Sequence, residues 1–151
     1  MPGANSVVTK RMSARYFLDT NVFVSVFTPT AAAKSRRANE LVRDALGTGR
    51  GVISYQVAQE FVNVALHGFV RPLSTADIEQ YLTTVLRPMI AVHSSPALFL
   101  QALDLGSQYQ LPWPDSLILA AAIQAQCQIL YSEDFQTARR FGNLRVENLL
   151  K

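Results

Sequence analysis

The chain has 151 residues, of which 49% are hydrophobic and 17% charged, and this composition excludes an intrinsically disordered protein. A domain of this length buries roughly 70% of the surface of its unfolded chain, so it needs no disulfide to support a core. Lys and Arg number 14 against 11 Asp and Glu, and the net charge of +3 permits an RNA or acidic protein partner without demonstrating one.

The single cysteine, Cys127, excludes an internal disulfide and suits a reducing cytoplasm, which is the location we expect. It lies in the apolar segment LILAAAIQAQC, where we expect a small buried side chain in a helix. No apolar run approaches the length of a membrane span, so no membrane association is expected. We expect residues 1–14 to form a flexible tail and residues 15–151 to form one domain.

Short β-rich segments alternate with longer helical ones, which is typical of an α/β fold with a mostly parallel sheet. In chain order we expect a strand at 16–18, a short helix from Asn21, a helix at 34–46 closed by Gly47 and Gly49, a strand at 51–54, a helix at 56–67, a helix capped by Ser74 and ended by Pro88, a strand at 89–92, a helix from Ser95 and Pro96 to Tyr109, a turn at 111–114, a helix at 115–126 opened by Pro114, and strands at 129–131 and 144–146.

Four acidic residues follow these strands or open the next helices, namely Asp19, Glu60, Asp115 and Asp134. Because strand ends of an open α/β sheet converge in space, carboxylates distant in sequence can share one pocket there. Carboxylates in one pocket repel each other unless protons or cations enter, and Mg²⁺ or Mn²⁺ are the usual partners of all-oxygen ligands. The placement indicates a metal-dependent site that cleaves phosphodiesters.

Each acid also has a purely structural interpretation. Asp19 is a good cap for the helix that follows it, and Asp115 would be stabilised in a first helical turn by the helix dipole. Asp134 could be a first-turn acid behind a Ser132 cap, and Glu60 could lie on a solvated polar stripe. Four independent structural roles would have to place acids at the same sheet edge by coincidence, whereas one metal site requires it.

The predicted helix at 34–46 contains four basic residues that could bind RNA phosphates: Lys34, Arg36, Arg37 and Arg43. A solvated helix face, partly balanced by Glu40, is the alternative interpretation. Glu133, which neighbours the fourth acid, is expected to point outward. The chain has no Gly-rich phosphate loop, no His-x-Glu zinc pattern and no His beside a Ser or Cys nucleophile, so a bound metal must supply the chemistry.

Four segments, in this order, resemble the PIN-domain ribonucleases: YFLDTNVFVSVF, ISYQVAQEFVNV, WPDSLILAAAIQ and ILYSEDFQ. More narrowly they are similar to the VapC toxins of type II toxin–antitoxin pairs, over a span from about Arg15 to Asn148. The departures are small, since Ser132 stands where threonine is commoner and Trp113-Pro114 precedes the third acid. The resemblance implies a three-layer α/β/α sandwich around a parallel sheet.

The resemblance also assigns the site. Asp19, Glu60, Asp115 and Asp134 fall on the family's acidic quartet, and Asn21 and Ser132 fall on polar positions that help to orient it. We expect Asp19, Asp115 and Asp134 to hold one or two Mg²⁺ or Mn²⁺ ions, with Glu60 binding directly or through water.

The activity implied is cleavage of a structured RNA, such as a transfer or ribosomal RNA, leaving a 5′-phosphate and a 3′-hydroxyl. The partners implied are a second copy of the chain, as a homodimer, and a VapB-type antitoxin that directs a basic side chain toward the carboxylates. Other hypotheses stay open: a stand-alone PIN nuclease of RNA processing, or a catalytically silent PIN binding module. A receiver-like phosphoacceptor domain is disfavoured, since it needs clustered acids on the first strand and a lysine after a late strand.

Overall fold

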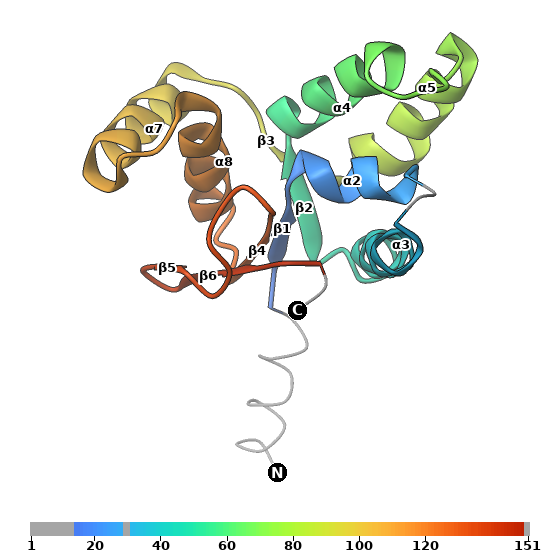
Figure 1. The fold of residues 1–151 in the computed structure, drawn as a ribbon. Coiled ribbons are helices and arrows are strands. Elements are labelled where there is room, and N and C mark those ends of the chain that lie inside the picture. Colours follow the sequence, from blue (N-terminus) through green and yellow to red (C-terminus); the bar gives the residue numbers. More distant parts are fainter. Residues whose placement is uncertain (1–13, 29–30, 150–151) are drawn as a thin grey trace.

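The computed structural model describes residues 14–28 and 31–149, which form an α/β fold (Figure 1). Its elements in chain order are β1 (Tyr16–Leu18), α2 (Thr20–Val26), α3 (Ala32–Thr48), β2 (Gly51–Ser54), α4 (Tyr55–His67), α5 (Thr75–Tyr81), the π-helical turn η1 (Leu82–Leu86), α6 (Arg87–Met89), β3 (Ile90–Val92), α7 (Pro96–Tyr109), α8 (Trp113–Gln124), β4 (Ile129–Tyr131), β5 (Arg140–Phe141) and β6 (Leu144–Glu147). The predicted flexible tail lies outside the described residues except for Ala14.

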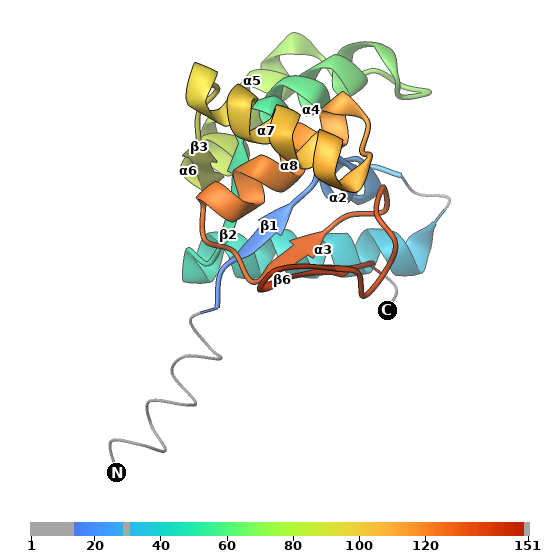
Figure 2. The ribbon, with the colours of Figure 1, turned by 90° about the vertical axis from the view of Figure 1, so that its left-hand side faces the viewer.

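The described strands make a six-stranded sheet in the order β3-β2-β1-β4-β6-β5. Every neighbouring pair is parallel except β5 and β6. Helices α7 and α8 lie on one side of the sheet, and α2 and α3 lie on the other (Figures 1 and 2). The predicted α/β class with a mostly parallel sheet is therefore confirmed, and the carboxyl ends of β1, β2 and β4 meet at one edge.

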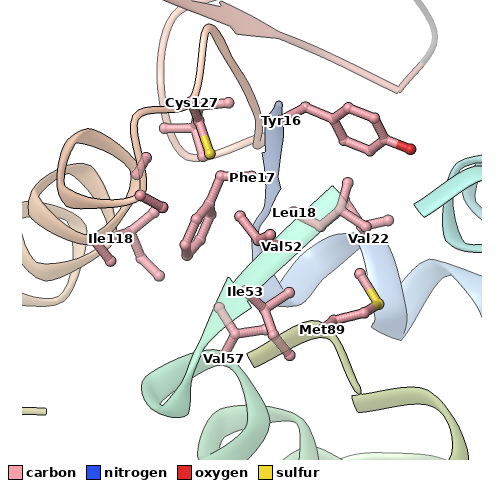
Figure 3. Close-up of a cluster of buried hydrophobic side chains, with 14 of the residues drawn as sticks. Tyr16, Phe17, Leu18, Val22, Val52, Ile53, Val57, Met89, Ile118 and Cys127 are labelled. Atoms are coloured by element: carbon pink, nitrogen blue, oxygen red, sulfur yellow. The ribbon is translucent and has the colours of Figure 1, made fainter. Parts of the chain in front are cut away.

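The central strands are apolar because both of their faces are covered by helices. Phe17 and Leu18 of β1 and Leu130 of β4 are fully buried, as expected for strands covered on both faces. Alternation along β1 sends Phe17 toward Ile118 of α8, while Leu18 lies on the opposite side (Figure 3). The strand is thus fixed between two helical layers, which sets the position of the residue that follows it.

Capping positions predicted from the sequence are present. Ser74 Oγ accepts a hydrogen bond from the Asp77 backbone N–H at 3.1 Å, and Ser95 Oγ accepts one from the Leu98 N–H at 3.1 Å. Gly49 ends α3 with a φ of +73°, a conformation that glycine adopts without steric cost. No helix in the described part of the chain is long and apolar enough to cross a membrane.

The prediction that Pro88 ends a helix is wrong, because the helical path continues through α6 to Met89. The backbone N–H of Arg87 donates to the carbonyl of Leu82, five residues earlier, so the turn before the proline is wider than an α-helical turn. We attribute the continuation to this wider turn, since proline lacks an N–H and its ring clashes with the preceding turn of a regular α-helix.

The structure differs from the sequence prediction in two ways near the C-terminus. Helix α8 runs from Trp113 to Gln124 rather than over 115–126, and Gln126 has a φ of +60°, so buried Cys127 follows the helix instead of lying in it. The sequence analysis also missed β5, which pairs with β6 across a turn at Gly142 and Asn143. Gly142 has a φ of +62°, which suits the first central position of a tight hairpin turn.

Candidate active site

The four predicted acids lie on different elements around one edge of the sheet. Asp19 directly follows β1 and caps α2, Glu60 lies in the middle of α4, and Asp115 lies in the first turn of α8. Asp134 follows β4 in an irregular segment, so the alternative that made it a first-turn helical acid does not hold. Burial and hydrogen bonding then decide how each carboxylate behaves.

Asp19 is the most buried of the four, with 2% of its surface exposed. One carboxylate oxygen accepts the Thr20 backbone N–H at 2.7 Å, and the other accepts the Ser132 hydroxyl at 2.6 Å. Burial raises the pKa of Asp19 to about 7, although the hydrogen bonds from Ser132 and Thr20 act in the opposite direction. The negative charges of Asp134 and Glu60 raise this pKa further, so both carboxylates lie close enough to act on Asp19.

Glu60 is held by two side chains that the sequence analysis did not single out. The Thr20 hydroxyl donates to Glu60 Oε2 at 2.9 Å, and Gln56 Nε2 donates to Oε1 at 2.8 Å. Gln56 Nε2 also donates to the backbone carbonyl of Pro114 at 3.1 Å. These contacts tie α4 to the starts of α2 and α8. The only sequence signal for them is position, since Thr20 neighbours an acid and Gln56 lies one helical turn before Glu60.

Asp115 and Asp134 are the remaining two acids, and their charges also act on each other. Burial raises the pKa of Asp115, and the charges of Asp134 and Glu60 raise it further. The backbone N–H of Asp134 donates to Ser132 Oγ at 3.1 Å, while the same hydroxyl donates to Asp19. Ser132, itself 2% exposed, therefore connects the segment after β4 to the carboxylate after β1.

This acidic cluster of Asp19, Glu60, Asp115 and Asp134 has no basic partner within the described chain. The ion pairs found there join Lys34 to Glu133, Arg37 to Glu40, Arg50 to Asp44 and Arg145 to Glu147. Adjacent carboxylates without a counter-charge are costly to keep ionised. The cluster is therefore suited to a cation supplied from outside the chain.

The donor set fits a hydrated Mg²⁺ or Mn²⁺ ion. Carboxylate oxygens are available on four side chains, and the buried Oδ1 of Asn21 has no hydrogen-bond partner among the described residues. No group of three or more His, Cys, Asp or Glu side chains in the described chain lies close enough together to hold a metal ion by itself. A Mg²⁺ site here would therefore depend on water and substrate phosphates beside one or two carboxylates, which is a common arrangement for this ion.

The predicted RNA-binding residues on α3 differ in their surroundings. Lys34 forms an ion pair with Glu133, so Glu133 is engaged in a contact rather than pointing freely outward. Arg37 lies 3.7 Å from Glu40, the acid expected to balance this helix. Arg36 and Arg43 are exposed and have no ion pair within the described residues.

Comparisons with known proteins agree with this geometry. A family model described as the PIN domain matches residues 16–142. A search of curated proteins finds no significant match. Among solved structures, the chain is similar to FitAB bound to a DNA fragment (16% identity, 90% of this chain and 96% of that chain covered, TM-score 0.62).

Two other solved structures show a comparable likeness. One is a toxin–antitoxin complex from Klebsiella pneumoniae (19% identity, 85% of this chain and 94% of that chain, TM-score 0.59). The other is VapBC-1 from nontypeable Haemophilus influenzae (16% identity, 90% and 98%, TM-score 0.58). At these identities the likeness shows the fold, whereas the family match extends over most of the sequence. The chain therefore belongs to the PIN domain family.

Proposed function

We propose that this protein is a metal-dependent endoribonuclease that acts as a VapC-type toxin. The observation that carries the proposal is the acidic cluster, in which carboxylates from separate elements act on one another without any basic partner in the described chain. A bound Mg²⁺ or Mn²⁺ would supply an activated water and would stabilise charge on the scissile phosphate. Membership of the PIN domain family supports a nuclease as the class of enzyme.

The protein's own residues would hold and orient that site. Asp19, fixed by the Ser132 hydroxyl and the Thr20 N–H, would present an oxygen in a set orientation. Asp115 and Asp134 would complete the metal-binding set, and Glu60 would bind directly or through water. The amide oxygen of Asn21, which has no hydrogen-bond partner among residues 14–28 and 31–149, would accept a hydrogen bond from a bound water.

The substrate we propose is a structured cellular RNA, such as a transfer or ribosomal RNA, cut to leave a 5′-phosphate and a 3′-hydroxyl. The resemblance to PIN-domain ribonucleases supports RNA, and the net charge of +3 permits it. The choice of a toxin over a stand-alone RNA-processing nuclease rests on the VapC-like motifs and on fold neighbours that are toxin–antitoxin complexes.

A VapB-type antitoxin is the proposed inhibitor. An acidic cluster without a basic partner in the described part of the chain would accept an arginine from an antitoxin, because charge-assisted hydrogen bonds to carboxylates are strong and directional. Occupation by a guanidinium would compete with the metal for the same oxygens.

A homodimer is the proposed assembly, and helix α7 supports it. Phe99, Leu100 and Leu103 of this helix are 43%, 69% and 58% exposed, and Trp113 packs edge-on against Phe99 with ring centroids 5.4 Å apart. Adjacent large apolar side chains left in water are typical of interaction surfaces.

Cleavage of RNA by the purified protein tests the proposal. We expect Mg²⁺-dependent cleavage that EDTA stops and that Asp115→Asn abolishes, while the variant remains as fully folded as the wild type. Asp104→Asn, which removes an exposed acid of α7, is the matched control and should retain full activity. Wild-type protein that binds no divalent cation and cuts no RNA would indicate a silent PIN module. A gene for a small antitoxin beside that of an active enzyme separates the toxin from the stand-alone nuclease.

A further inference from the structure

A pocket lies at the opposite end of β4 from the acidic cluster. It has a volume of about 450 Å³ and is lined by Gln128, Ile129, Arg140, Asn143 and Arg145. The hairpin of β5 and β6 contributes both arginines, and it lies at the end of the sheet where β1 begins, whereas α2 begins at the other end (Figures 1 and 2). We call the four polar residues of this pocket, Gln128, Arg140, Asn143 and Arg145, the hairpin site.

The two arginines of the hairpin site are cross-strand neighbours. Arg140 stands directly opposite Arg145 in the antiparallel pair of β5 and β6. Like charges in this arrangement destabilise a hairpin unless an opposite charge lies between them. No carboxylate lines the pocket, and the Arg140 side chain makes no ion pair within residues 14–28 and 31–149.

Arg145 is only partly neutralised. Its Nε lies 2.7 Å from Glu147 Oε1, which is an ion-pair distance. The ion pair engages one nitrogen of the guanidinium, and the Arg145 side chain is 43% exposed. An acceptor from solvent can therefore reach the rest of the group.

The remaining side chains suit a phosphate group. Gln128 and Asn143 can each donate amide N–H groups, and guanidinium groups match the geometry of phosphate oxygens. The backbone holds the pocket rigidly, since Gln128 N donates to Arg15 O at 2.9 Å and Arg145 N donates to Gln128 O at 2.9 Å. The two arginines therefore extend from paired strands, while Gln128 and Asn143 lie at the start of β4 and in the hairpin turn.

The hairpin site is connected to the acidic cluster along β4. A neighbouring pocket also contacts Ile129 and extends to Tyr131. Its two acids, Glu40 and Asp44, form ion pairs with its two arginines, Arg37 and Arg50. Ser132 lies four positions after Gln128, which corresponds to about 13 Å at roughly 3.3 Å per residue of strand. If the RNA backbone advances by roughly 3.4 Å per nucleotide, as one strand of a DNA duplex does, that distance corresponds to about four nucleotides.

We propose that the hairpin site binds a backbone phosphate of the RNA substrate about four nucleotides from the bond that is cut. This inference rests on the proposed nuclease function and adds a contact that positions the RNA. It predicts that short RNAs, which cannot reach the hairpin, are bound and cut independently of Arg140, whereas longer RNAs depend on it.

Binding of labelled RNA to the full chain, measured by fluorescence anisotropy in EDTA so that no cutting occurs, tests the proposal. Loss of one phosphate contact lowers the slope of log K against log salt by about 0.7 for a single strand, so Arg140→Ala should weaken binding of a 12-nucleotide RNA about 8-fold at 50 mM salt and about 3-fold at 200 mM. A trinucleotide should be bound equally by both proteins. Arg87→Ala, which removes the same charge from an exposed position on α6, should leave both affinities unchanged.

The outcomes separate the two proposals. If the wild-type protein cuts RNA and Arg140→Ala binds the longer RNA with the same affinity and salt slope, the hairpin inference is wrong and the nuclease proposal stands. If inorganic phosphate competes at the hairpin but no RNA affinity depends on Arg140, a different anionic partner fills the pocket and the inference is again wrong. If the wild-type protein neither binds nor cuts RNA, both proposals are wrong.

Discussion

Replacement of Asp19 by asparagine should stabilise the metal-free protein at neutral and alkaline pH. The substitution keeps the shape of the side chain, since the amide oxygen can accept the Thr20 N–H and the amide nitrogen can donate to the Ser132 hydroxyl in place of the present bonds. The substitution removes the negative charge from a residue that is 2% exposed and that other carboxylates repel. The variant should therefore lose both the cost of burying that charge and its repulsion by Asp134 and Glu60.

The magnitude follows from the pKa of Asp19, which burial raises from 3.8 to about 7. Because the folded-state pKa lies above the unfolded value, the stabilising contribution of the protonated form is fully present below pH 4 and is lost as the pH rises through about 7. A pKa shift of this size corresponds to a free-energy difference of about 4 kcal/mol between the two protonation states of Asp19. Part of this shift comes from repulsion between Asp19 and the neighbouring acids, which can also take up protons. We therefore expect Asp19→Asn to raise the free energy of unfolding by about 2 to 4 kcal/mol at pH 8 and to change it little near pH 4.

Urea denaturation in EDTA at pH 4, 6 and 8 measures this difference, with Asp104→Asn as a control that should show no pH-dependent gain. Adding Mg²⁺ at about 100 times its dissociation constant should then stabilise the wild type by about 2.7 kcal/mol and the Asp19→Asn variant by much less. A variant that is less stable than the wild type at pH 8 in EDTA would show the opposite, namely that the protein stabilises the ionised form of Asp19.

Three further substitutions probe the same structure. Ser132→Ala removes the hydroxyl that hydrogen-bonds the segments after β1 and β4, and we expect a 10- to 100-fold loss of Mg²⁺ affinity in a calorimetric titration. Gln56→Ala removes one of the two hydrogen-bond donors to Glu60, so the rate of cleavage should fall about 10-fold while the midpoint of thermal unfolding changes little.

Gly51→Ala tests the packing of β2 against α3. The added Cβ collides with Ala45 of α3, and the substitution should cost about 1 to 3 kcal/mol of stability in urea denaturation. Gly47→Ala meets no atom within 4 Å and should cost nothing; equal effects at the two glycines would contradict the packing described.

The central strands could be predicted from the sequence because their residues identify them locally. The runs at Tyr16–Leu18, Gly51–Ser54 and Ile129–Tyr131 are apolar and bounded by turn or capping residues, and the structure has strands with these bounds. Strand β5 could not be found in this way, since two residues carry no periodic pattern and only their pairing with β6 defines them. The path of the chain through Pro88 likewise depends on a widened turn that local propensity does not predict.

The candidate site was predictable to the extent that strand order governs it. Parallel strands bring the segments after β1 and β4 together, so Asp19 and Ser132 meet although they are 113 residues apart. The contacts of Glu60 with Thr20 and Gln56 depend instead on how α4 packs against α2, which no local pattern encodes. The pairing of Lys34 with Glu133 was missed for the same reason, because both residues have ordinary solvated positions in the sequence.

The central claim is that the acidic cluster binds a divalent cation. A crystal of the protein grown with Mn²⁺ at pH 8, measured at a wavelength where manganese scatters anomalously, tests this claim most directly. We expect an anomalous peak bonded to Asp19 and at least one other acid of the cluster, with water completing the coordination, and no such peak in Asp19→Asn crystals. A map with no peak between these carboxylates, or with a Mn²⁺ ion bound only elsewhere on the molecule, would contradict it.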